Sequence, residues 1–508
     1  MTIELELSRT HLPVASLFRH ARELPNRLAL VDSTTSVTYG ELLLRVQVVA
    51  ARLHAAGVRP DDRVAVVAGN CAAFPVVVLA TNYLGAIIVP VNFRLAAGEI
   101  AYILGNCEPT VVVTDAERAD VTRDAIGDAP LTMFDLTELA GPGPIGASES
   151  VPDPMIRSLT DDQAIIYTSG TTGRPKGAVL SYSSVLSTTM RSSVSGQYRP
   201  GQEVGLLASP MFHIAAFNAI DTNLANAATT VITPSTGFDA ANILDLMEEH
   251  GITVTFMVPS QWQLMVDEQR RRPRDIKLGF YGWGAAPATE ALLTALREVF
   301  PEAGSQAAFG QTETSGGGVS LSHEDSLRKL GSVGKPDRNF SIRVVDPEMN
   351  DVPHGEVGEI VYQGPGLMSR YWNNPKATAE AFHGGWFHSG DLVRQDEEGF
   401  LYVVDRVKDM IISGGENIYC AELENVVAWH PKVAEVAVVG RRDEKWGEIP
   451  VAVVVPRNEE ELPSLEEIRE FCDGKLARYK LPKDVVIREG FPRSGTGKIQ
   501  KTVLRQKV

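Results

Sequence analysis

Helical and strand-like patterns alternate along the first third of the chain. Apolar side chains recur at helical spacing in residues 40–56, and the run DRVAVVAG at 62–69 is short, apolar and rich in β-branched residues. The alternation continues with an expected helix near 97–106 and the strand-like run TVVVTD at 110–115. Helices that alternate with short, continuous apolar strands are typical of a parallel sheet buried between helices. The pattern therefore predicts layered α/β structure.

One uncharged stretch is long enough to raise the question of a membrane helix. The run AAFPVVVLATNYLGAIIVPV at 72–91 carries no charge over about the length of a membrane-spanning segment. However, Pro75, Asn82, Gly85 and other interrupting residues divide it. We expect a helix over about 74–84 followed by a buried strand over 86–91, and no transmembrane segment.

The pattern also divides the chain into regions. Residues 138–154 (ELAGPGPIGASESVPDP) are rich in Gly, Pro and Ser and lack periodicity, which is typical of a connector. Beyond it, strands are expected at 229–233, 252–257 and 278–282, and helices at 239–250 and 287–299.

From about residue 340 the chain reads as short strands separated by turns. Near the C-terminus, VAEVAVVGRRDEKWGEIPVAVVVP predicts two strands joined by a charged loop, and an amphipathic helix is expected near 464–477. This combination predicts a small α+β unit. We place the boundary near Asp405–Asp409, so that residues 1–405 form an N-terminal domain and residues 406–508 form a C-terminal domain.

Length, charge and cysteine content narrow the class of protein. A chain of 508 residues is too long for one ordinary hydrophobic core, and its net charge of −16 argues against a broad nucleic-acid surface. The start, MTIELELSRTHLP, lacks the apolar core of a signal peptide. The cysteines are scattered, without disulfide or zinc-site spacing, which favours reduced thiols and a cytoplasmic location. They are Cys71, Cys107, Cys420 and Cys472.

The stretch YTSGTTGRPKGA at 167–178 follows a strand-like run and predicts a phosphate-binding loop. Glycines let backbone N–H groups approach a phosphate closely, hydroxyls add donors, and a lysine adds positive charge. The spacing is not that of a Walker A loop, and GWGAAP at 282–287 fails the Rossmann pattern at Pro287. The candidate polyphosphate ligands are Thr168, Ser169, Gly170, Thr171, Thr172, Gly173 and Lys176.

The same stretch resembles the signature loop of the acyl-adenylate-forming superfamily. The likeness recurs in order from NFRL at 92–95 to SGTGKIQK at 494–501, and it is greatest to bacterial medium- and long-chain fatty-acyl-CoA ligases. The resemblance implies a large multi-layer N-terminal adenylate-forming domain and a small, mobile α+β C-terminal domain. It also implies that a carboxylic acid is activated by ATP and Mg²⁺ as acyl-AMP and is then transferred to coenzyme A.

The resemblance assigns nucleotide and metal contacts to four further blocks, FGQTET, WFHSGDL, GWGAAP and DRVKD. Taken alone, FGQTET and WFHSGDL are also compatible with ordinary polar turns. In the family, the first block contacts adenine, the acyl carboxylate and the metal, so Glu313 is expected to hold Mg²⁺ together with Thr168. Asp391 is expected to bind the ribose hydroxyls, and Arg406 to support the nucleotide. The remaining nucleotide contacts are expected from Phe309, Gly310, Gln311, Thr312, Gly284, Ala285 and Ala286.

The C-terminal region carries the catalytic lysine and the hinge implied by the resemblance. Lys498 in PRSGTGKIQK is expected to stabilise charge that grows on the α-phosphate and carboxylate during adenylation. Lys408 occupies the hinge position in DRVKDMIISGGENIYC. Gly414 and Gly415 offer a bare backbone along which the pantetheine arm of CoA can pass. An ordinary hairpin turn would also explain these two glycines.

The acyl site is expected around His213, Trp283, Gly316 and Gly317. His213 in SPMFHIAAFN matches a residue beside the acyl pocket in the family, and the glycines of TSGGGVSL suggest a slot for a medium or long acyl chain. A turn that needs positive φ explains these glycines nearly as well. Short-chain or aromatic acids, and a stand-alone adenylation enzyme that loads a carrier protein, remain alternatives. The sequence leaves open whether the chain forms a homodimer.

Overall fold

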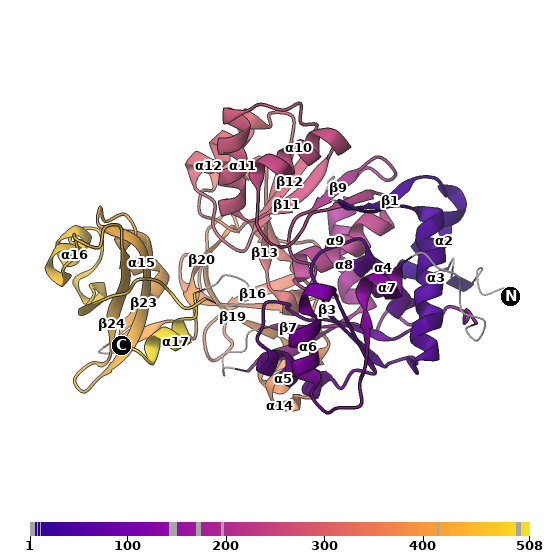
Figure 1. Ribbon diagram of the computed structural model, residues 1–508. Coiled ribbons are helices and arrows are strands. Elements are labelled where there is room, and N and C mark those ends of the chain that lie inside the picture. Colours follow the sequence, from indigo (N-terminus) through magenta and orange to yellow (C-terminus); the bar gives the residue numbers. More distant parts are fainter. Residues whose placement is uncertain are drawn as a thin grey trace. The chain divides into compact units, whose positions relative to one another are not determined.

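The computed structural model describes residues 6–7, 9–10, 12–141, 150–168, 174–194, 198–413, 416–493 and 499–508. The chain divides into two compact units (Figure 1). The first contains residues up to 168, 175–341 and 362–383, and the second consists mainly of residues 342–361 and 384–508. The boundary expected after residue 405 lies inside the second unit and stays a prediction.

Two sheets organise the first unit. The nine-stranded sheet has the order β15-β14-β13-β12-β11-β9-β10-β1-β2, and the seven-stranded sheet has the order β18-β8-β7-β4-β3-β5-β6. In the first sheet the strands are β1 (Leu28–Val31), β2 (Ser36–Thr38), β9 (Val204–Leu207), β10 (Thr229–Ile232), β11 (Val254–Met257), β12 (Phe280–Gly284), β13 (Gly304–Gly310), β14 (Gly318–Ser322) and β15 (Lys335–Pro336). In the second they are β3 (Arg63–Val67), β4 (Ile87–Pro90), β5 (Val111–Thr114), β6 (Thr132–Asp135), β7 (Asp162–Thr168), β8 (Lys176–Ser181) and β18 (Arg370–Tyr371).

The predicted parallel strands are present. Strand β3 pairs in parallel with β4 on one side and with β5 on the other, and the stretch examined for a membrane helix forms helix α4 (Ala73–Tyr83) followed by β4. Strands β9 to β13 are also parallel, with antiparallel neighbours at both edges of their sheet. Within the described part of the chain, no helix combines the length and apolar character needed to span a membrane.

Helices cover these sheets. Helices α2, α3, α4, α8 and α9 contact one another, and α10, α11 and α12 form a second group (Figure 1). The helix expected over 40–56 starts at a capping box formed by Thr38 and Glu41. The helices of the first unit besides α4 are α2 (Pro13–Glu23), α3 (Tyr39–Ala55), α5 (Ala97–Cys107), α6 (Ala119–Ile126), α7 (Leu136–Ala140), α8 (Tyr182–Val194), α9 (Ile214–Ala225), α10 (Ala240–His250), α11 (Pro259–Arg271), α12 (Glu290–Val299), α13 (Asp325–Arg328) and α14 (Pro375–Ala381).

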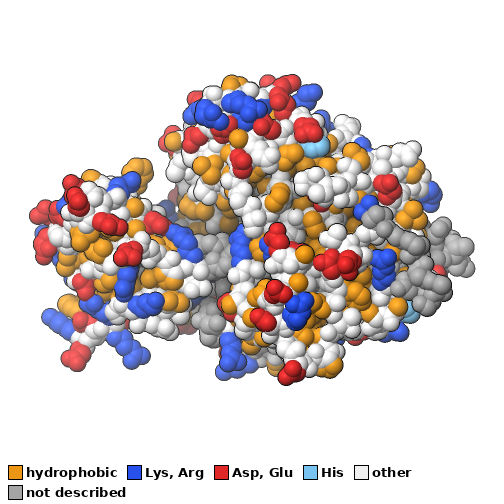
Figure 2. Space-filling model, viewed as in Figure 1, with side chains coloured by type: hydrophobic (Ala, Val, Ile, Leu, Met, Phe, Trp, Pro, Cys, Tyr) orange, Lys and Arg blue, Asp and Glu red, His pale blue; other side chains and the backbone are white. Residues whose placement is uncertain are grey.

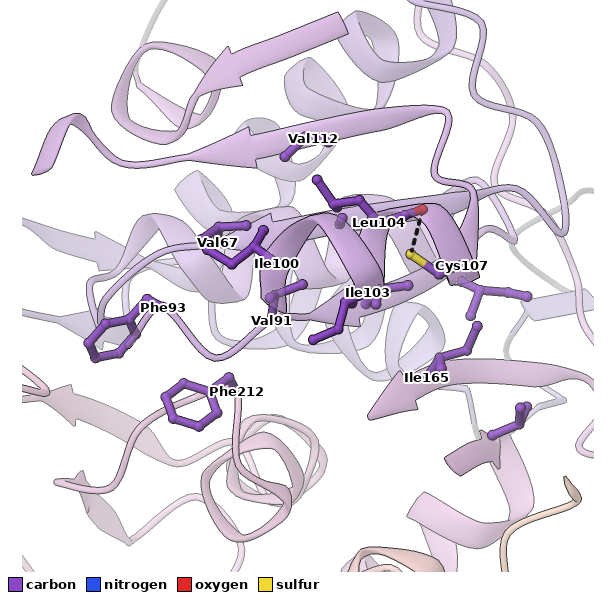
Figure 3. Packing of buried hydrophobic residues seen from close by; sticks show 14 residues of the cluster. Val67, Val91, Phe93, Ile100, Ile103, Leu104, Cys107, Val112, Ile165 and Phe212 are labelled. Atoms are coloured by element: carbon purple, nitrogen blue, oxygen red, sulfur yellow. Dashed lines mark hydrogen bonds between the residues drawn. The ribbon is translucent and has the colours of Figure 1, made fainter. Parts of the chain in front are cut away.

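A buried apolar cluster joins α5 to the seven-stranded sheet. Figure 3 shows Ile100, Ile103 and Leu104 of α5 close to strand residues such as Val112. Apolar area removed from water stabilises a fold by roughly 25 cal/mol per Å², so this packing holds the sheet that carries β7 and β8.

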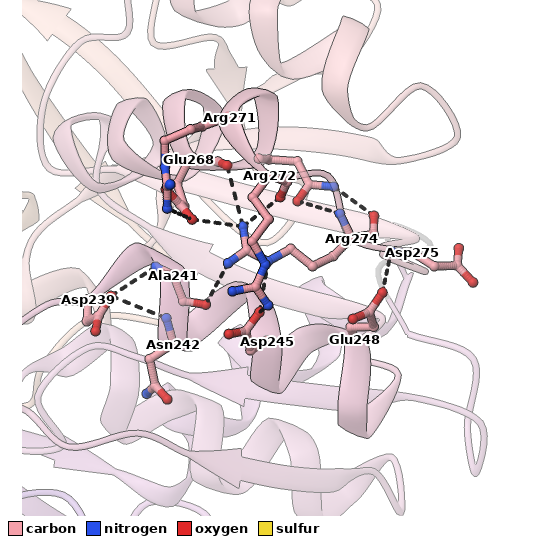
Figure 4. A network of polar contacts seen from close by, with 11 residues as sticks. Asp239, Ala241, Asn242, Asp245, Glu248, Glu268, Arg271, Arg272, Arg274 and Asp275 are labelled. Carbon is pink, nitrogen blue, oxygen red and sulfur yellow. Dashed lines mark hydrogen bonds and ion pairs between the residues drawn. The ribbon is translucent and has the colours of Figure 1, made fainter.

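A buried guanidinium ties α10 to the end of α11. The Arg274 side chain is 1% exposed, and it donates to Asp245 on α10 at 2.8 Å and to Glu268 on α11 at 3.0 Å. Figure 4 shows its further bonds to main-chain carbonyls, including those of Arg272 at 2.7 Å and Ala241 at 3.3 Å. On the face shown in Figure 2, acidic and basic side chains are interspersed over this region.

A buried carboxyl group on α9 is expected to make stability depend on pH. Gln163 Nε2 donates to Asp221 Oδ2 at 2.6 Å, and Asp221 Oδ1 is buried without a hydrogen-bond partner among the described residues. Burial raises the pKa of Asp221 from 3.8 to about 6. The folded chain therefore keeps a proton that the unfolded chain has lost, so the free energy of unfolding falls by about 3 kcal/mol as pH rises from about 4 to above 6.

Asp221→Asn tests this expectation, because asparagine keeps the shape of the side chain without its ionisation. The stability of the variant relative to wild type should increase across the same pH window, as measured by urea unfolding at several pH values. A difference that does not change with pH would contradict the expectation.

The second unit contains two antiparallel-rich sheets. One has the order β16-β17-β19-β20, with strands β16 (Ser341–Val345), β17 (Val357–Gln363), β19 (Phe387–Gln395) and β20 (Leu401–Arg406). The other has the order β22-β21-β24-β23, and β25 pairs with β24. Its elements are β21 (Ile411–Ser413), β22 (Glu416–Ile418), β23 (Val433–Asp443), β24 (Gly447–Pro456) and β25 (Asp484–Ile487), with helices α15 (Cys420–Val427), α16 (Leu465–Cys472) and α17 (Lys501–Arg505).

This second sheet confirms the predicted α+β pattern near the C-terminus. Strands β23 and β24 form the expected antiparallel pair, with Val438 opposite Ala452. Helix α16 ends at Cys472, earlier than the expected 477, and Gly474 adopts φ +73° two residues later. The residue between them, Asp473, is already extended with ψ 138°, and the left-handed Gly474 that follows does not resume the right-handed helix.

Candidate active site

The β7–β8 hairpin frames the glycine-rich stretch. The two strands are antiparallel, with Thr168 opposite Lys176 at the end where the chain leaves β7 and enters β8. Gly177 is required there, because a Cβ atom on it would lie 2.7 Å from the side chain of Ile165. Five predicted phosphate ligands lie outside the described residues, namely Ser169, Gly170, Thr171, Thr172 and Gly173.

The structure brings Glu313 to this hairpin. Glu313 lies in a short 3₁₀ turn (Thr312–Thr314), and it is only 6% exposed. Its Oε1 atom accepts hydrogen bonds from the Thr168 hydroxyl at 3.2 Å and from the Tyr371 hydroxyl at 2.9 Å. Thr168 and Glu313, which were predicted to act together, are therefore in direct contact.

Tyr371 was absent from the predicted site. It lies on β18, which pairs antiparallel with β8 so that Tyr371 is opposite Ala178. The Lys176 ammonium lies 5.1 Å from the centre of its ring. The stretch SRYWNN at 369–374 contains no motif that points to phosphate or metal binding. The contact is seen only in the structure, where β18 pairs with β8.

The donor set at Thr168 and Glu313 fits Mg²⁺. The Thr168 hydroxyl and the Glu313 carboxylate both supply oxygen, the ligand atom that Mg²⁺ prefers, and they are in direct contact, with Thr168 Oγ1 3.2 Å from Glu313 Oε1. Among the described residues no cluster of three His, Cys, Asp or Glu side chains could hold a metal. A site with one carboxylate suits a cation that binds mainly water and substrate phosphates.

The predicted adenine-side residues lie where β12 and β13 end. Gly310 has no room for a side chain, because a Cβ atom on it would lie 2.2 Å from the carbonyl oxygen of Gly317. The Gln311 N–H group donates to the Thr314 hydroxyl at 3.0 Å, which tightens the turn that begins there. Phe309 is half-buried on β13, and Thr312 opens the 3₁₀ turn.

Strand β12 ends in a backbone conformation that is unusual for its residues. Ala285 has φ +65° and is exposed, as is Ala286, while Gly284 is buried. A non-glycine residue at positive φ costs of order 1–3 kcal/mol and is often found at functional sites. The observation is compatible with the predicted nucleotide contact of this turn.

The two faces of β12 separate Trp283 from the neighbouring glycines. Trp283 is buried beside Tyr281, with ring centres 6.1 Å apart, and Tyr281 packs against Trp262 of α11. Gly282 and Gly284 face Phe256 instead, because successive residues of a strand point to opposite faces. The Trp283 ring thus belongs to interior packing, and a role as substrate wall stays a prediction.

His213 and the side chain that packs on Gly316 both lie at the start of α9. His213 is the N-cap residue of this helix. Gly316 has φ +71°, and a Cβ atom on it would lie 3.5 Å from Ile214 in the first helical turn. Gly317 lies next to the Arg191 and Asp337 side chains. Gly316 therefore serves a turn with positive φ, and Gly317 serves close packing.

In the second unit, Asp391 and Arg406 are direct neighbours. They face each other across β19 and β20, and Arg406 Nε lies 2.8 Å from Asp391 Oδ1. The buried Asp391 is thus held beside a cation. The carbonyl of Lys408 accepts a hydrogen bond from Arg505 of α17 at 2.9 Å. Gly414, Gly415 and Lys498 lie outside the described residues.

Comparisons with known proteins agree with this arrangement. Residues 17–372 match the model of the AMP-binding enzyme family, and residues 422–498 match the AMP-binding enzyme C-terminal domain. The chain is 39% identical to a long-chain-fatty-acid–CoA ligase of Mycobacterium tuberculosis, covering 96% of this chain and 97% of the relative. It is 37% identical to a feruloyl-CoA synthase of an Amycolatopsis species, again covering 96% and 97%.

A solved structure is similar over nearly the whole length. The o-succinylbenzoate CoA synthetase of Bacillus subtilis in complex with its acyl-adenylate intermediate has a TM-score of 0.87 and 31% identity, covering 96% of this chain and 97% of that one. The same enzyme with ATP and a magnesium ion has a TM-score of 0.85. CoA ligases of this family use ATP with Mg²⁺ and coenzyme A. The chain belongs to the AMP-binding enzyme family, and within it to the ATP-dependent acyl-CoA ligases.

Proposed function

We propose that this ligase activates a medium- or long-chain fatty acid. In the first step the carboxylate attacks the α-phosphate of ATP, giving acyl-AMP and pyrophosphate. In the second step the CoA thiol attacks the acyl carbon, and AMP leaves. The carboxylate needs this activation because oxide is a very poor leaving group, whereas AMP is a good one.

One observation carries the ATP-dependent part of the proposal. A buried carboxylate, two hydroxyls and a lysine converge where the chain leaves β7 and enters β8, through Glu313, Thr168, Tyr371 and Lys176. Bound there, Mg²⁺ would neutralise part of the phosphate charge. We propose that Glu313 and Thr168 hold it, and that Lys176 and the glycine-rich residues hold the phosphates.

The remaining roles follow from the resemblance and are proposals. Asp391 binds the ribose hydroxyls and Arg406 supports the nucleotide. Lys498 assists adenylation, and the residues after 405 turn about Lys408 so that Gly414 and Gly415 serve thioester formation. Such a two-position motion has a chemical logic, because each step must exclude water from a different attacking group.

The surroundings of His213 favour an apolar acyl group. Its neighbours in sequence on both sides are buried and apolar, including Met211, Phe212 and Ile214. This supports the fatty acid, as does the identity with a long-chain-fatty-acid–CoA ligase.

An aromatic acid is the second candidate. The space beside Gly282 and Gly284 is occupied by Phe256, and a Cβ atom on Gly318 would meet Tyr362 at 2.8 Å. The glycines therefore do not by themselves provide the long slot that the sequence suggested. The similarity to a feruloyl-CoA synthase also favours this candidate.

A panel of carboxylic acids tests the proposal. Acids of six to eighteen carbons, short-chain acids and aryl acids such as ferulate are compared at equal concentration by pyrophosphate release and by CoA thioester formation. We expect the highest kcat/KM for a medium- or long-chain fatty acid. A higher value for an aryl acid would replace the first candidate with the second. Thioester formation without any carrier protein would exclude the carrier-loading alternative.

A further inference from the structure

One side chain outside the predicted set contacts both charged residues at the β7–β8 hairpin. The Tyr371 hydroxyl donates to Glu313 Oε1 at 2.9 Å, and its ring lies 5.1 Å from the Lys176 ammonium. We propose that Tyr371 is a positioning residue that orients the Glu313 carboxylate toward Mg²⁺ and the Lys176 ammonium toward the ATP phosphates. This inference rests on the proposed roles of Glu313 and Lys176.

Of the two hydroxyls that donate to Glu313, that of Tyr371 is the more constant donor. Thr168 has one hydroxyl proton but two acceptors within reach, Glu313 Oε1 at 3.2 Å and the Lys176 carbonyl at 3.4 Å. Tyr371 makes the shorter bond to Glu313. A tyrosine hydroxyl carries a proton at neutral pH and can therefore donate to the carboxylate.

This bond fixes which carboxylate oxygen faces the cation. Both donors bind Oε1, and among the described residues Glu313 Oε2 accepts no hydrogen bond. A carboxylate with one oxygen held by two hydroxyls keeps a single orientation and leaves its second oxygen for a ligand. Orienting a metal-binding carboxylate through a hydrogen bond from a second residue commonly changes metal affinity by 10- to 100-fold.

Tyr371 itself is held by its neighbours. Its backbone N–H donates to the Thr378 hydroxyl at 3.0 Å, and its strand pairs with β8. On one side Arg370 forms a bidentate ion pair with Asp162, with distances of 3.0 and 2.6 Å. On the other, the Trp372 indole donates to the carbonyl of Asn106 at 3.2 Å. The phenol is therefore held in one position, from which it can orient Glu313 and Lys176.

The hydroxyl of Tyr371 contacts Glu313 and its ring contacts Lys176, so two variants can separate the two contacts. Tyr371→Phe removes the bond to Glu313 and keeps the ring beside Lys176, whereas Tyr371→Leu removes both. A cation near an aromatic face at an exposed site gains about two- to fivefold in affinity, whereas a hydrogen bond to a charged group contributes about tenfold or more. Loss of the hydroxyl should therefore weaken metal binding, and loss of the ring should weaken binding of the ATP phosphates.

The test measures metal binding directly on the full-length protein. Mn²⁺ is titrated in the presence of α,β-methylene-ATP without acid, and bound Mn²⁺ is followed by electron paramagnetic resonance. For Tyr371→Phe we expect the Mn²⁺ dissociation constant to rise about tenfold. The Mg²⁺ concentration for half-maximal pyrophosphate release should rise in parallel, while KM for the acid stays unchanged. Tyr371→Leu should also weaken binding of the ATP analogue at saturating Mg²⁺, by about threefold.

Tyr39→Phe is the matched control. Tyr39 is buried in the same unit, and its hydroxyl donates to the carbonyl of Ala228 at 2.8 Å. The Tyr39→Phe variant should lower the unfolding temperature about as much as Tyr371→Phe does, and it should leave Mn²⁺ affinity unchanged. The inference is overturned if Tyr371→Phe leaves Mn²⁺ affinity within twofold of wild type, or if Tyr39→Phe changes it equally. A failure of the proposed function is distinguishable, because no acid would then give a CoA thioester with wild-type protein.

Discussion

Lys498→Ala is expected to slow acyl-adenylate formation by about 10²- to 10³-fold and to leave thioester formation from supplied acyl-AMP near the wild-type rate. A cation directed at the α-phosphate and carboxylate oxygens stabilises charge that grows only in the transition state of the first step. The two half-reactions are measured separately, by pyrophosphate release without CoA and by thioester formation from purified acyl-AMP and CoA.

Lys507→Ala controls for the loss of a positive charge near the C-terminus. Lys507 is exposed, so its removal should affect neither half-reaction. Equal losses in both half-reactions of Lys498→Ala would contradict the proposed role. Such a result would point instead to a general disturbance of the C-terminal segment.

Arg274→Ala is expected to have the largest effect on stability, lowering the free energy of unfolding by about 3 kcal/mol. The buried guanidinium satisfies two carboxylates and several main-chain carbonyls that join α10 to the end of α11 (Figure 4). Alanine would remove this donor from the main-chain carbonyls, would leave Asp245 and Glu268 paired only with the exposed Arg272 and Arg271, and would open a cavity between the helices. Urea unfolding followed by tryptophan fluorescence measures the change, with the buried Trp262 on α11 as one reporter.

Arg272→Ala is the matched control, because Arg272 pairs with the same Asp245 at 2.8 Å but is 58% exposed. An exposed ion pair contributes about 0.2–1 kcal/mol, so this variant should unfold almost like wild type. Similar losses in the two variants would show that burial of Arg274 does not decide its contribution.

Local patterning was sufficient for much of the fold. The division of 72–91 into helix α4 and strand β4 followed from prolines and a glycine inside an apolar run, and the structure confirms it. The alternation of helices with β-branched runs also predicted the parallel strands β3, β4 and β5. Both signals depend on neighbours within a few residues, which is the range over which side-chain periodicity acts.

Local patterning was insufficient where a residue's task depends on the face it occupies. Trp283 and Gly284 are adjacent in sequence, yet one packs toward α11 and the other toward Phe256. The glycines after residue 315 suggested an open slot, but their surroundings are largely filled by protein atoms. What fills such a space comes from residues far away in the chain, which a sequence window does not contain.

The amino-acid sequence by itself determined the layered α/β class, the α+β pattern near the C-terminus and the motifs that identify an acyl-CoA ligase, because each is encoded in residues close together along the chain. Only the tertiary structure decided that Tyr371 contacts Glu313 and Lys176. These residues come from separate segments. The pairing of β18 with β8 brings Tyr371 beside Lys176, and the turn that carries Glu313 contacts β8. Strand pairing over such separations depends on the burial of whole sheets, and no short motif specifies it.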